Sequence, residues 1–349
     1  MHLTVFDGEK FTSVSGKEAA ELVELGQAGA SQPRSVWVDI CVSDTEDGAA
    51  IDLMSRLGVD ADAAMEALRS RLDMSFTVTP EEVHGAAWVD DGDGTRASQV
   101  RFNWNAERLV TVRKSGDAGM AFVREEILER FPDGRRGGVR LLADVLELMM
   151  VTVQRGLTDL AVRVGELNLS VLERTRPDSS LNGELSEYQA IFYSIGLRFP
   201  TYLVNLRAAL IDPPKVRGTV PTDVELLRQY ASIVDSTQLV IDSVDGSIHN
   251  VARDLQAQAA TWQGNQINAL TALATVFIPV TFITSYFGMN FDWMVDRIGG
   301  FGQFIFFGVV LIIVTAVSAV AWLRYSGYDL SVDKKEGKER ARSQLKRRR

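Results

Sequence analysis

Residues 265–296 read NQINALTALATVFIPVTFITSYFGMNFDWMVD and contain no charged side chain before Asp292. A second uncharged stretch follows at residues 298–323. Each stretch includes an apolar run of about 20 residues or more, the length that crosses the hydrocarbon core of a bilayer as a helix. Soluble helices need a polar face, and these runs lack one. We therefore predict a hairpin of two membrane-spanning helices, at 266–287 and 298–323, joined by an external loop at 288–297.

The C-terminal tail, residues 324–349, is strongly basic. Its residues 334–349 carry a net charge of +7, whereas the whole chain carries −9. Lys and Arg next to a span mark the cytoplasmic side of a membrane, so we expect the tail in the cytoplasm. With two spans, the N-terminal part must lie there too. The protein is predicted to cross the plasma (inner) membrane twice, as a multi-pass protein with both termini in the cytoplasm.

The N-terminus and the lone Cys41 agree with this location. Residues 1–10 lack the apolar core of a signal peptide, and a single cysteine fits a reducing compartment. Beside a span, the basic tail is expected to meet the anionic headgroups of the lipid bilayer. Because the rest of the chain is acidic, we expect no nucleic acid as a partner.

Residues 1–140 alternate short β-like runs with amphipathic helical stretches. This alternation predicts an α+β cytosolic domain, a mixed sheet flanked by helices. The expected strands cover residues 1–6, 35–40, 82–89, 99–103 and 108–113. The expected helices cover residues 16–28, 46–57 and 60–72.

Residues 141–220 are expected to form a helical part of the same cytosolic region. From Leu142 to Val171, apolar residues recur three and four positions apart, as on one face of a helix. Breaks are expected at residues 177–182 and at the Asp-Pro-Pro of residues 212–214.

A single long helix is expected from about residue 222 to residue 287. Pro221 fits the first turn of a helix, and no other proline occurs before Pro279. Such a helix would be about 100 Å long at about 1.5 Å per residue. Residues 221–265 would then be a stalk helix that runs directly into the first span.

Two helices cannot enclose a pore, so a two-span protein that conducts ions must form a ring of copies. The first span is the better candidate for the pore wall because it carries more polar residues than the second. Steps of three and four residues along it define a stripe of mostly small, uncharged side chains. We call this set the pore-lining stripe: Gly264, Ile267, Leu270, Thr271, Ala274, Ile278 and Thr281. A wall of this kind suits an ion that keeps its water shell, and apolar rings can gate it by dewetting. Alternatively, the threonine hydroxyls only hydrogen-bond their own backbone.

The loop between the spans carries a specific resemblance. Gly288-Met289-Asn290, with TVFIPVTFI at residues 275–283 before it and FDWM at residues 291–294 after it, resembles the signature of the CorA family of magnesium transporters. The strands predicted at residues 35–40 and 108–113 resemble that family more weakly. The resemblance covers the whole chain in architecture, but its specific motifs lie within residues 264–296.

The resemblance implies a funnel-shaped homopentamer whose selectivity filter is Gly288, Met289 and Asn290. A ring of Asn290 amide oxygens could accept hydrogen bonds from hydrated Mg²⁺, which loses its waters reluctantly. Asp292 and Asp296 would form an external acidic loop that concentrates cations, or would simply be solvated. No cofactor is implied; by this resemblance Mg²⁺ would be the substrate and also the regulatory ligand that closes the gate from the cytosolic side.

The regulatory metal site departs from the family pattern. The acid of the family's stalk falls near Gln229, which is not a carboxylate. Asp235 and Asp242 are therefore the candidate regulatory metal ligands on the stalk. Val295 stands where a loop proline is common in the family, which would loosen the loop without changing its chemistry.

Three alternatives remain. A transporter of zinc, cobalt or nickel could have the same fold, although zinc prefers imidazole and thiolate ligands and neither occurs in the predicted spans. A two-span signalling or scaffold protein would need a ligand-binding domain between its spans, and the loop is too short to supply one. An enzyme is not expected, because the sequence shows no phosphate-binding loop, no Cys/His cluster and no nucleophile motif.

Overall fold

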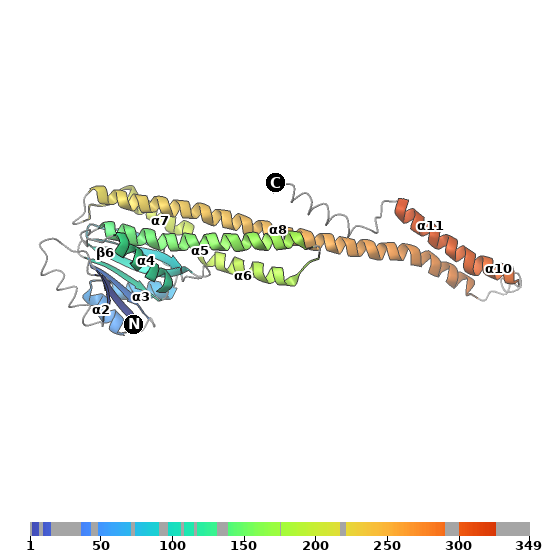
Figure 1. Ribbon diagram of the computed structural model, residues 1–349, viewed down its shortest axis with the longest axis horizontal. Helices are drawn as coiled ribbons and strands as arrows, with labels where there is room; N and C mark the ends of the chain where they lie inside the picture. The colour runs from blue at the N-terminus through green and yellow to red at the C-terminus, as the bar shows by residue number, and fades with distance from the viewer. Residues whose placement is uncertain are drawn as a thin grey trace. The chain divides into compact units, whose positions relative to one another are not determined.

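The computed structural model describes residues 2–6, 10–14, 36–42, 48–70, 74–90, 97–105, 108–114, 117–130, 139–174, 176–216, 221–289 and 300–325. Its contacts divide the chain into two compact units. The first unit comprises Met1–Leu167 and Gly183–Asn250, and the second comprises Asn168–Asn182 and Val251–Arg349. Figure 1 labels helices of both units and strand β6.

A seven-stranded mixed sheet lies in the first unit, with the strand order β2-β1-β3-β7-β6-β5-β4. Strands β3 and β7 pair in parallel, and the other neighbouring strands that the structure describes pair antiparallel. The strands are β1 (His2–Phe6), β2 (Phe11–Ser13), β3 (Val36–Cys41), β4 (Phe76–Val78), β5 (Glu82–Asp90), β6 (Ala97–Asn105) and β7 (Arg108–Arg113). The predicted mixed sheet is confirmed, whereas the short β2 and β4 were not predicted.

Helices cover both faces of this sheet (Figure 1). Alternate residues of β3, such as Val38 and Ile40, pack into one hydrophobic core with α2 (Gly48–Arg56) and α3 (Ala61–Ser70). The intervening Asp39 points to the opposite face, where it meets Arg124 of α4 (Asp117–Arg130). Because successive side chains of a strand point to opposite faces, the fully buried β3 must be covered on both sides.

The face that meets α4 contains a buried charge network centred on Asp39. Its carboxylate accepts hydrogen bonds from Thr111 Oγ1 at 2.8 Å, Arg113 Nη2 at 3.0 Å and Arg124 Nη1 at 3.0 Å. The side chains of Asp39 and Arg113 are only 1% and 3% exposed. Burial is the largest single influence and lowers the pKa of Arg113, but the facing Asp39 carboxylate together with Asp117 and Cys41 more than offsets it, so the pKa is raised. Arg113 therefore stays charged inside the protein, and it depends on Asp39 for compensation.

The remaining helices follow the sheet in the chain. They are α5 (Val139–Glu173), α6 (Ser179–Gly196), α7 (Phe199–Ile211), α8 (Pro221–Phe287), α10 (Phe301–Ile305), the π-helical turn η1 (Phe306–Val310) and α11 (Leu311–Tyr325). The single long helix predicted from about residue 222 to residue 287 is confirmed as α8. The predicted break at residues 177–182 is too long, because α6 already begins at Ser179. The Asp178 side chain accepts the Ser180 N–H at 2.9 Å and so caps α6. The helix expected at residues 16–28 lies outside the described residues.

Within the first unit, α7 and α8 are joined by two polar contacts. The hydroxyls of Tyr202 and Tyr230 lie 2.8 Å apart, and Arg207 Nη2 donates to Asp235 Oδ1 at 2.6 Å. Burial raises the pKa of both tyrosines well above the usual value, so their mutual hydrogen bond persists at every ordinary pH.

Tyr202→Phe is expected to lower the free energy of unfolding by about 1–3 kcal/mol, because it leaves the buried Tyr230 hydroxyl without its partner. Tyr202→Phe/Tyr230→Phe should cost less than the sum of the two single changes, since no polar group is then left unsatisfied. Urea unfolding followed by tryptophan fluorescence measures each change. Tyr193→Phe, at a 51% exposed position, is the control, and strict additivity of the buried pair would contradict the expectation.

Two helices are long and apolar enough to cross a membrane, namely Val224–Phe287 and Phe301–Tyr325. The predicted spans at 266–287 and 298–323 fall on them, except for residues 298 and 299, which lie outside the described part of the chain. The second helix consists of α10, η1 and α11. These properties suggest a membrane protein.

Candidate pore and metal site

The pore-lining stripe lies on the C-terminal part of α8, within the second unit. Its residues are exposed in the single chain, apart from the half-buried Gly264. Ile267, Leu270 and Ile278 are 54%, 66% and 67% exposed. Contiguous exposed apolar side chains normally mark a surface that lipid or another protein covers.

The residues of α8 that are covered lie on a different face. Within residues 265–287, Ala272 is buried and six residues are half-buried: Thr275, Val276, Pro279, Val280, Ile283 and Phe287. At 3.6 residues per turn, this face is centred about 160° from the pore-lining stripe.

The covered face packs against the second apolar helix of the same unit. The ring centroids of Phe287 and Phe307 lie 5.3 Å apart. Ala272 and Leu323 are 5% and 1% exposed. Because Phe287 on this face contacts Phe307 of η1, the pore-lining stripe is left on the side of α8 that faces away from η1.

The threonine hydroxyls of this part of α8 are largely occupied by their own helix. Thr271 Oγ1 donates to the Ile267 carbonyl, and Thr275 Oγ1 donates to the Thr271 carbonyl, each at 2.8 Å. Thr284 does the same toward Val280. Thr271, a member of the pore-lining stripe, thus makes the backbone hydrogen bond that the alternative interpretation expects. The wall offers few strong ligands to a dehydrated cation.

The signature residues follow the last turn of α8. The Gly288 N–H is shared between the carbonyls of Thr284 at 2.9 Å and Ser285 at 3.1 Å, and the Met289 N–H donates to Tyr286 at 3.3 Å. These contacts tighten the helix end, as is common where a helix stops. Asn290, Asp292 and Asp296 lie outside the described residues.

The candidate regulatory acids differ in their surroundings. Asp235 is held by Arg207, whereas Asp242 Oδ1 accepts a hydrogen bond from Gln238 Nε2 at 2.7 Å. Across the described ranges, no group of three His, Cys, Asp or Glu side chains could hold a metal ion.

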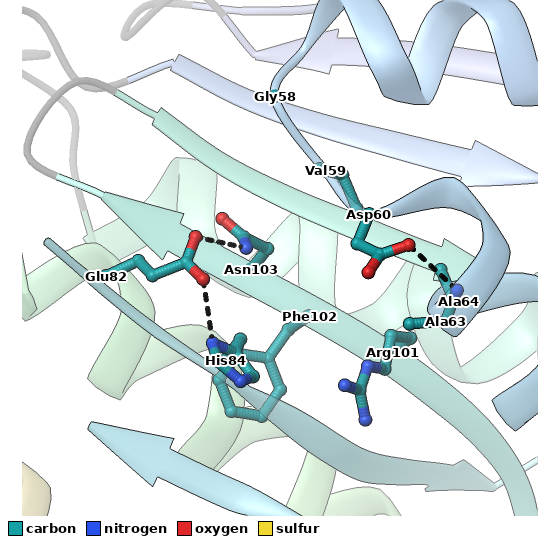
Figure 2. Close-up of a pocket in the computed structure, with 10 residues that line it drawn as sticks. All are labelled: Gly58, Val59, Asp60, Ala63, Ala64, Glu82, His84, Arg101, Phe102 and Asn103. Carbon is teal, nitrogen blue, oxygen red and sulfur yellow. Dashed lines mark hydrogen bonds and ion pairs between the residues drawn. The ribbon is translucent and has the colours of Figure 1, made fainter. Parts of the chain in front are cut away.

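Two features were not predicted from the sequence. The first is the packing face of α8, which the small or branched residues at Ala272, Val276 and Pro279 could have signalled through their helical spacing. The second is a polar cavity beside α3, lined by Glu82 and Arg101 (Figure 2). Alternating polar positions on two strands resemble an ordinary solvated face, so spacing alone does not reveal it.

Comparison with known proteins places most of the chain in one group. Residues 34–325 match the family described as CorA-like Mg²⁺ transporter protein. The chain is also 30% identical over 105 residues to a protein of Bacillus subtilis (strain 168) whose provisional name is metal ion transporter YfjQ. That match covers 29% of this chain and 32% of the relative's length.

Solved structures show the same fold. The complete structure of the CorA magnesium transporter from Methanocaldococcus jannaschii has a TM-score of 0.75 at 14% identity, and the match covers 94% of this chain and 99% of that one. The full-length CmaX protein gives 0.60 at 15% identity, covering 93% and 97%. The ZntB cytoplasmic domain from Vibrio parahaemolyticus gives 0.51 at 11% identity, covering 73% and 97%.

Proposed function

Because this chain belongs to the CorA-like Mg²⁺ transporter family, whose members are transporters rather than enzymes, we propose that it conducts divalent metal cations across a membrane, with Mg²⁺ as its main substrate. The two apolar helices would span the plasma (inner) membrane as a hairpin, with both termini in the cytoplasm. The solved structures of the same fold support this assignment through the long helix and the apolar helix that follows it.

The observation that carries the proposal is the exposed, uncharged pore-lining stripe, which faces away from η1 of the second apolar helix. A ring of copies would bring these stripes together around a central path and cover their exposed side chains. We propose a homopentamer, the assembly that the signature implies. Weakly ligating walls let a hydrated ion pass, since Mg²⁺ binds water more readily than it binds an uncharged helix surface.

Selectivity is assigned to Gly288, Met289 and Asn290. The tight end of α8 supports this assignment, because Gly288 and Met289 still bond to its last turn and Asn290 follows immediately. Five amide oxygens at one level would accept hydrogen bonds from the waters of the ion. Asp292 and Asp296 would raise the local cation concentration near that ring.

Closure of the gate is assigned to Mg²⁺ bound on the cytosolic side, where ions that favour the closed state shift the population toward it. Asp242 is the better candidate ligand of the two stalk acids. A metal at Asp235 would have to displace Arg207, which lies 2.6 Å from its carboxylate.

Ion flux into proteoliposomes tests the proposed function. The purified full chain should carry Mg²⁺, and it should carry Co²⁺ and Ni²⁺ through the same hydrated-ion path, whereas Zn²⁺ should be slower because the pore offers no imidazole or thiolate. Liposomes without protein are the control. Zn²⁺ flux above Mg²⁺ flux would favour the zinc alternative, and no flux of any divalent ion would refute the proposal.

A further inference from the structure

A polar cavity lies in the first unit between the start of α3 and strands β5 and β6 (Figure 2). Its volume is about 230 Å³. Five polar side chains line it: Asp60, Glu82, His84, Arg101 and Asn103. No part of the proposed ion path uses this cavity.

The sheet register explains why these side chains meet. His84 of β5 stands opposite Asn103 of β6, while Glu82 and Arg101 lie two residues before them on the same strands. Side chains two residues apart share one face of a strand, so all four project to the side covered by α3. Ala63 and Ala64 line the cavity from α3, and their small side chains leave the space unfilled.

On one side of the cavity, Glu82 organises its neighbours. Its Oε2 accepts a hydrogen bond from Asn103 Nδ2 at 2.7 Å, and its Oε1 lies 3.0 Å from His84 Nδ1 (Figure 2). Glu82 therefore holds both His84 and Asn103 on this side of the cavity.

On the other side, Asp60 and Arg101 provide opposite charges. Asp60 Oδ1 accepts the Ala63 N–H at 3.0 Å and caps α3. Arg101 Nη1 donates to Ser75 Oγ at 2.7 Å. Burial lowers the pKa of Arg101, and the nearby Asp60 charge partly offsets that effect. A partly desolvated guanidinium binds a carboxylate more strongly than an exposed one does.

We propose that this cavity binds a small zwitterion, an α-amino acid, with its carboxylate on Arg101 and its ammonium group near Asp60 and Glu82. The cavity presents both signs of charge, which a ligand of one sign would not match. A simple anion would face two carboxylates. A metal ion is disfavoured because Glu82 already engages His84 and Asn103. The volume is below the range of about 300–1,000 Å³ that drug-sized ligands occupy, which suits a molecule of amino-acid size.

Isothermal titration calorimetry on the detergent-solubilised full chain tests the proposal. L-Alanine and glycine should give saturable binding, whereas acetate and methylammonium, which each carry one of the two charges, should give none at the same concentrations. Arg101→Gln should weaken L-alanine binding by about tenfold or more, since it removes a charge-assisted contact. Arg56→Gln, which removes an exposed arginine of α2, should leave binding unchanged.

A second variant protects the test against a folding defect. Asp60→Ser retains a capping oxygen at the start of α3 but removes the carboxylate, so it should weaken L-alanine binding while far-UV circular dichroism stays unchanged. Binding of acetate or inorganic phosphate as tightly as L-alanine would overturn the proposal in favour of an anion site. Competition by Mg²⁺, or no saturable heat with either amino acid, would also overturn it. The readout is binding, so the result is independent of ion flux.

Discussion

Replacing Asn290 with alanine is expected to abolish Mg²⁺ uptake. In the proposed pentamer this change removes five amide oxygens from the ring that holds the hydrated ion. Each hydrogen bond of this kind contributes about 0.5–1.5 kcal/mol, so the summed loss predicts a fall in Mg²⁺ flux of about a hundredfold or more. Growth of a magnesium-transport-deficient strain on low Mg²⁺ and flux in proteoliposomes both measure it.

Assembly and a matched amide provide the controls for Asn290→Ala. Cross-linking in detergent should give the same ladder, ending at five, for the variant and the parent protein. Asn265→Ala removes an exposed amide of α8 from outside the pore-lining stripe and should retain most of the flux. Normal growth with Asn290→Ala would refute the selectivity role of this residue, and a dominant dimer would refute the pentameric pore.

Asp39→Asn is expected to cost about 3–5 kcal/mol of unfolding free energy, because it leaves a buried arginine charge without its carboxylate. Arg113 is 3% exposed, and it donates to Asp39 through both Nε and Nη2. The asparagine has nearly the same shape, so the loss would come from charge rather than from a void. Urea unfolding followed by tryptophan fluorescence reports it, since Trp37 Nε1 donates to Thr111, a neighbour of Asp39.

Asp117→Asn is the matched control, because Asp117 contacts the same arginine from the surface. Its carboxylate lies 2.6 Å from Arg113 Nη1 but is 79% exposed. Exposed ion pairs contribute about 0–1 kcal/mol, so this variant should remain close to the parent protein. Equal losses for Asp39→Asn and Asp117→Asn would show that burial does not decide the strength of this network.

Much of the fold could be predicted from proline placement, apolar periodicity and strand composition. Pro221 and residues 212–214 mark the start of α8 and the end of α7, because proline lacks the N–H that a helix interior needs. The long buried strands β3 and β7 are rich in β-branched residues and were recognised. The three-residue β2 and β4 are too short to show a periodic pattern. The start of α6 depended on a side-chain cap rather than on periodicity.

Less of the candidate site could be predicted. The pore-lining stripe follows from helical spacing, but which face of α8 the second apolar helix covers depends on contacts such as Phe287 with Phe307. Arg207 likewise occupies Asp235 through a contact between two different helices. Residue spacing could not reveal this contact, so it gave no reason to prefer Asp242 over Asp235 as a metal ligand. The α3 cavity depends on the register that places His84 opposite Asn103. Pairing register is a tertiary property, and a single sequence specifies it only weakly where the strand face is polar.

The π-helical turn η1 has a consequence for insertions and deletions in related chains. A π turn contains one residue more than an α turn, so it accommodates an insertion while the helix on either side keeps its regular geometry. Loss of one residue within Phe306–Val310 would convert η1 to an α-helical turn, and the side chains that follow would keep their directions. Elsewhere in α11, the same loss would rotate every later side chain by about 100° and turn Leu323 away from its covered position. Single-residue length differences among relatives should therefore be tolerated at η1 more readily than in the rest of this helix.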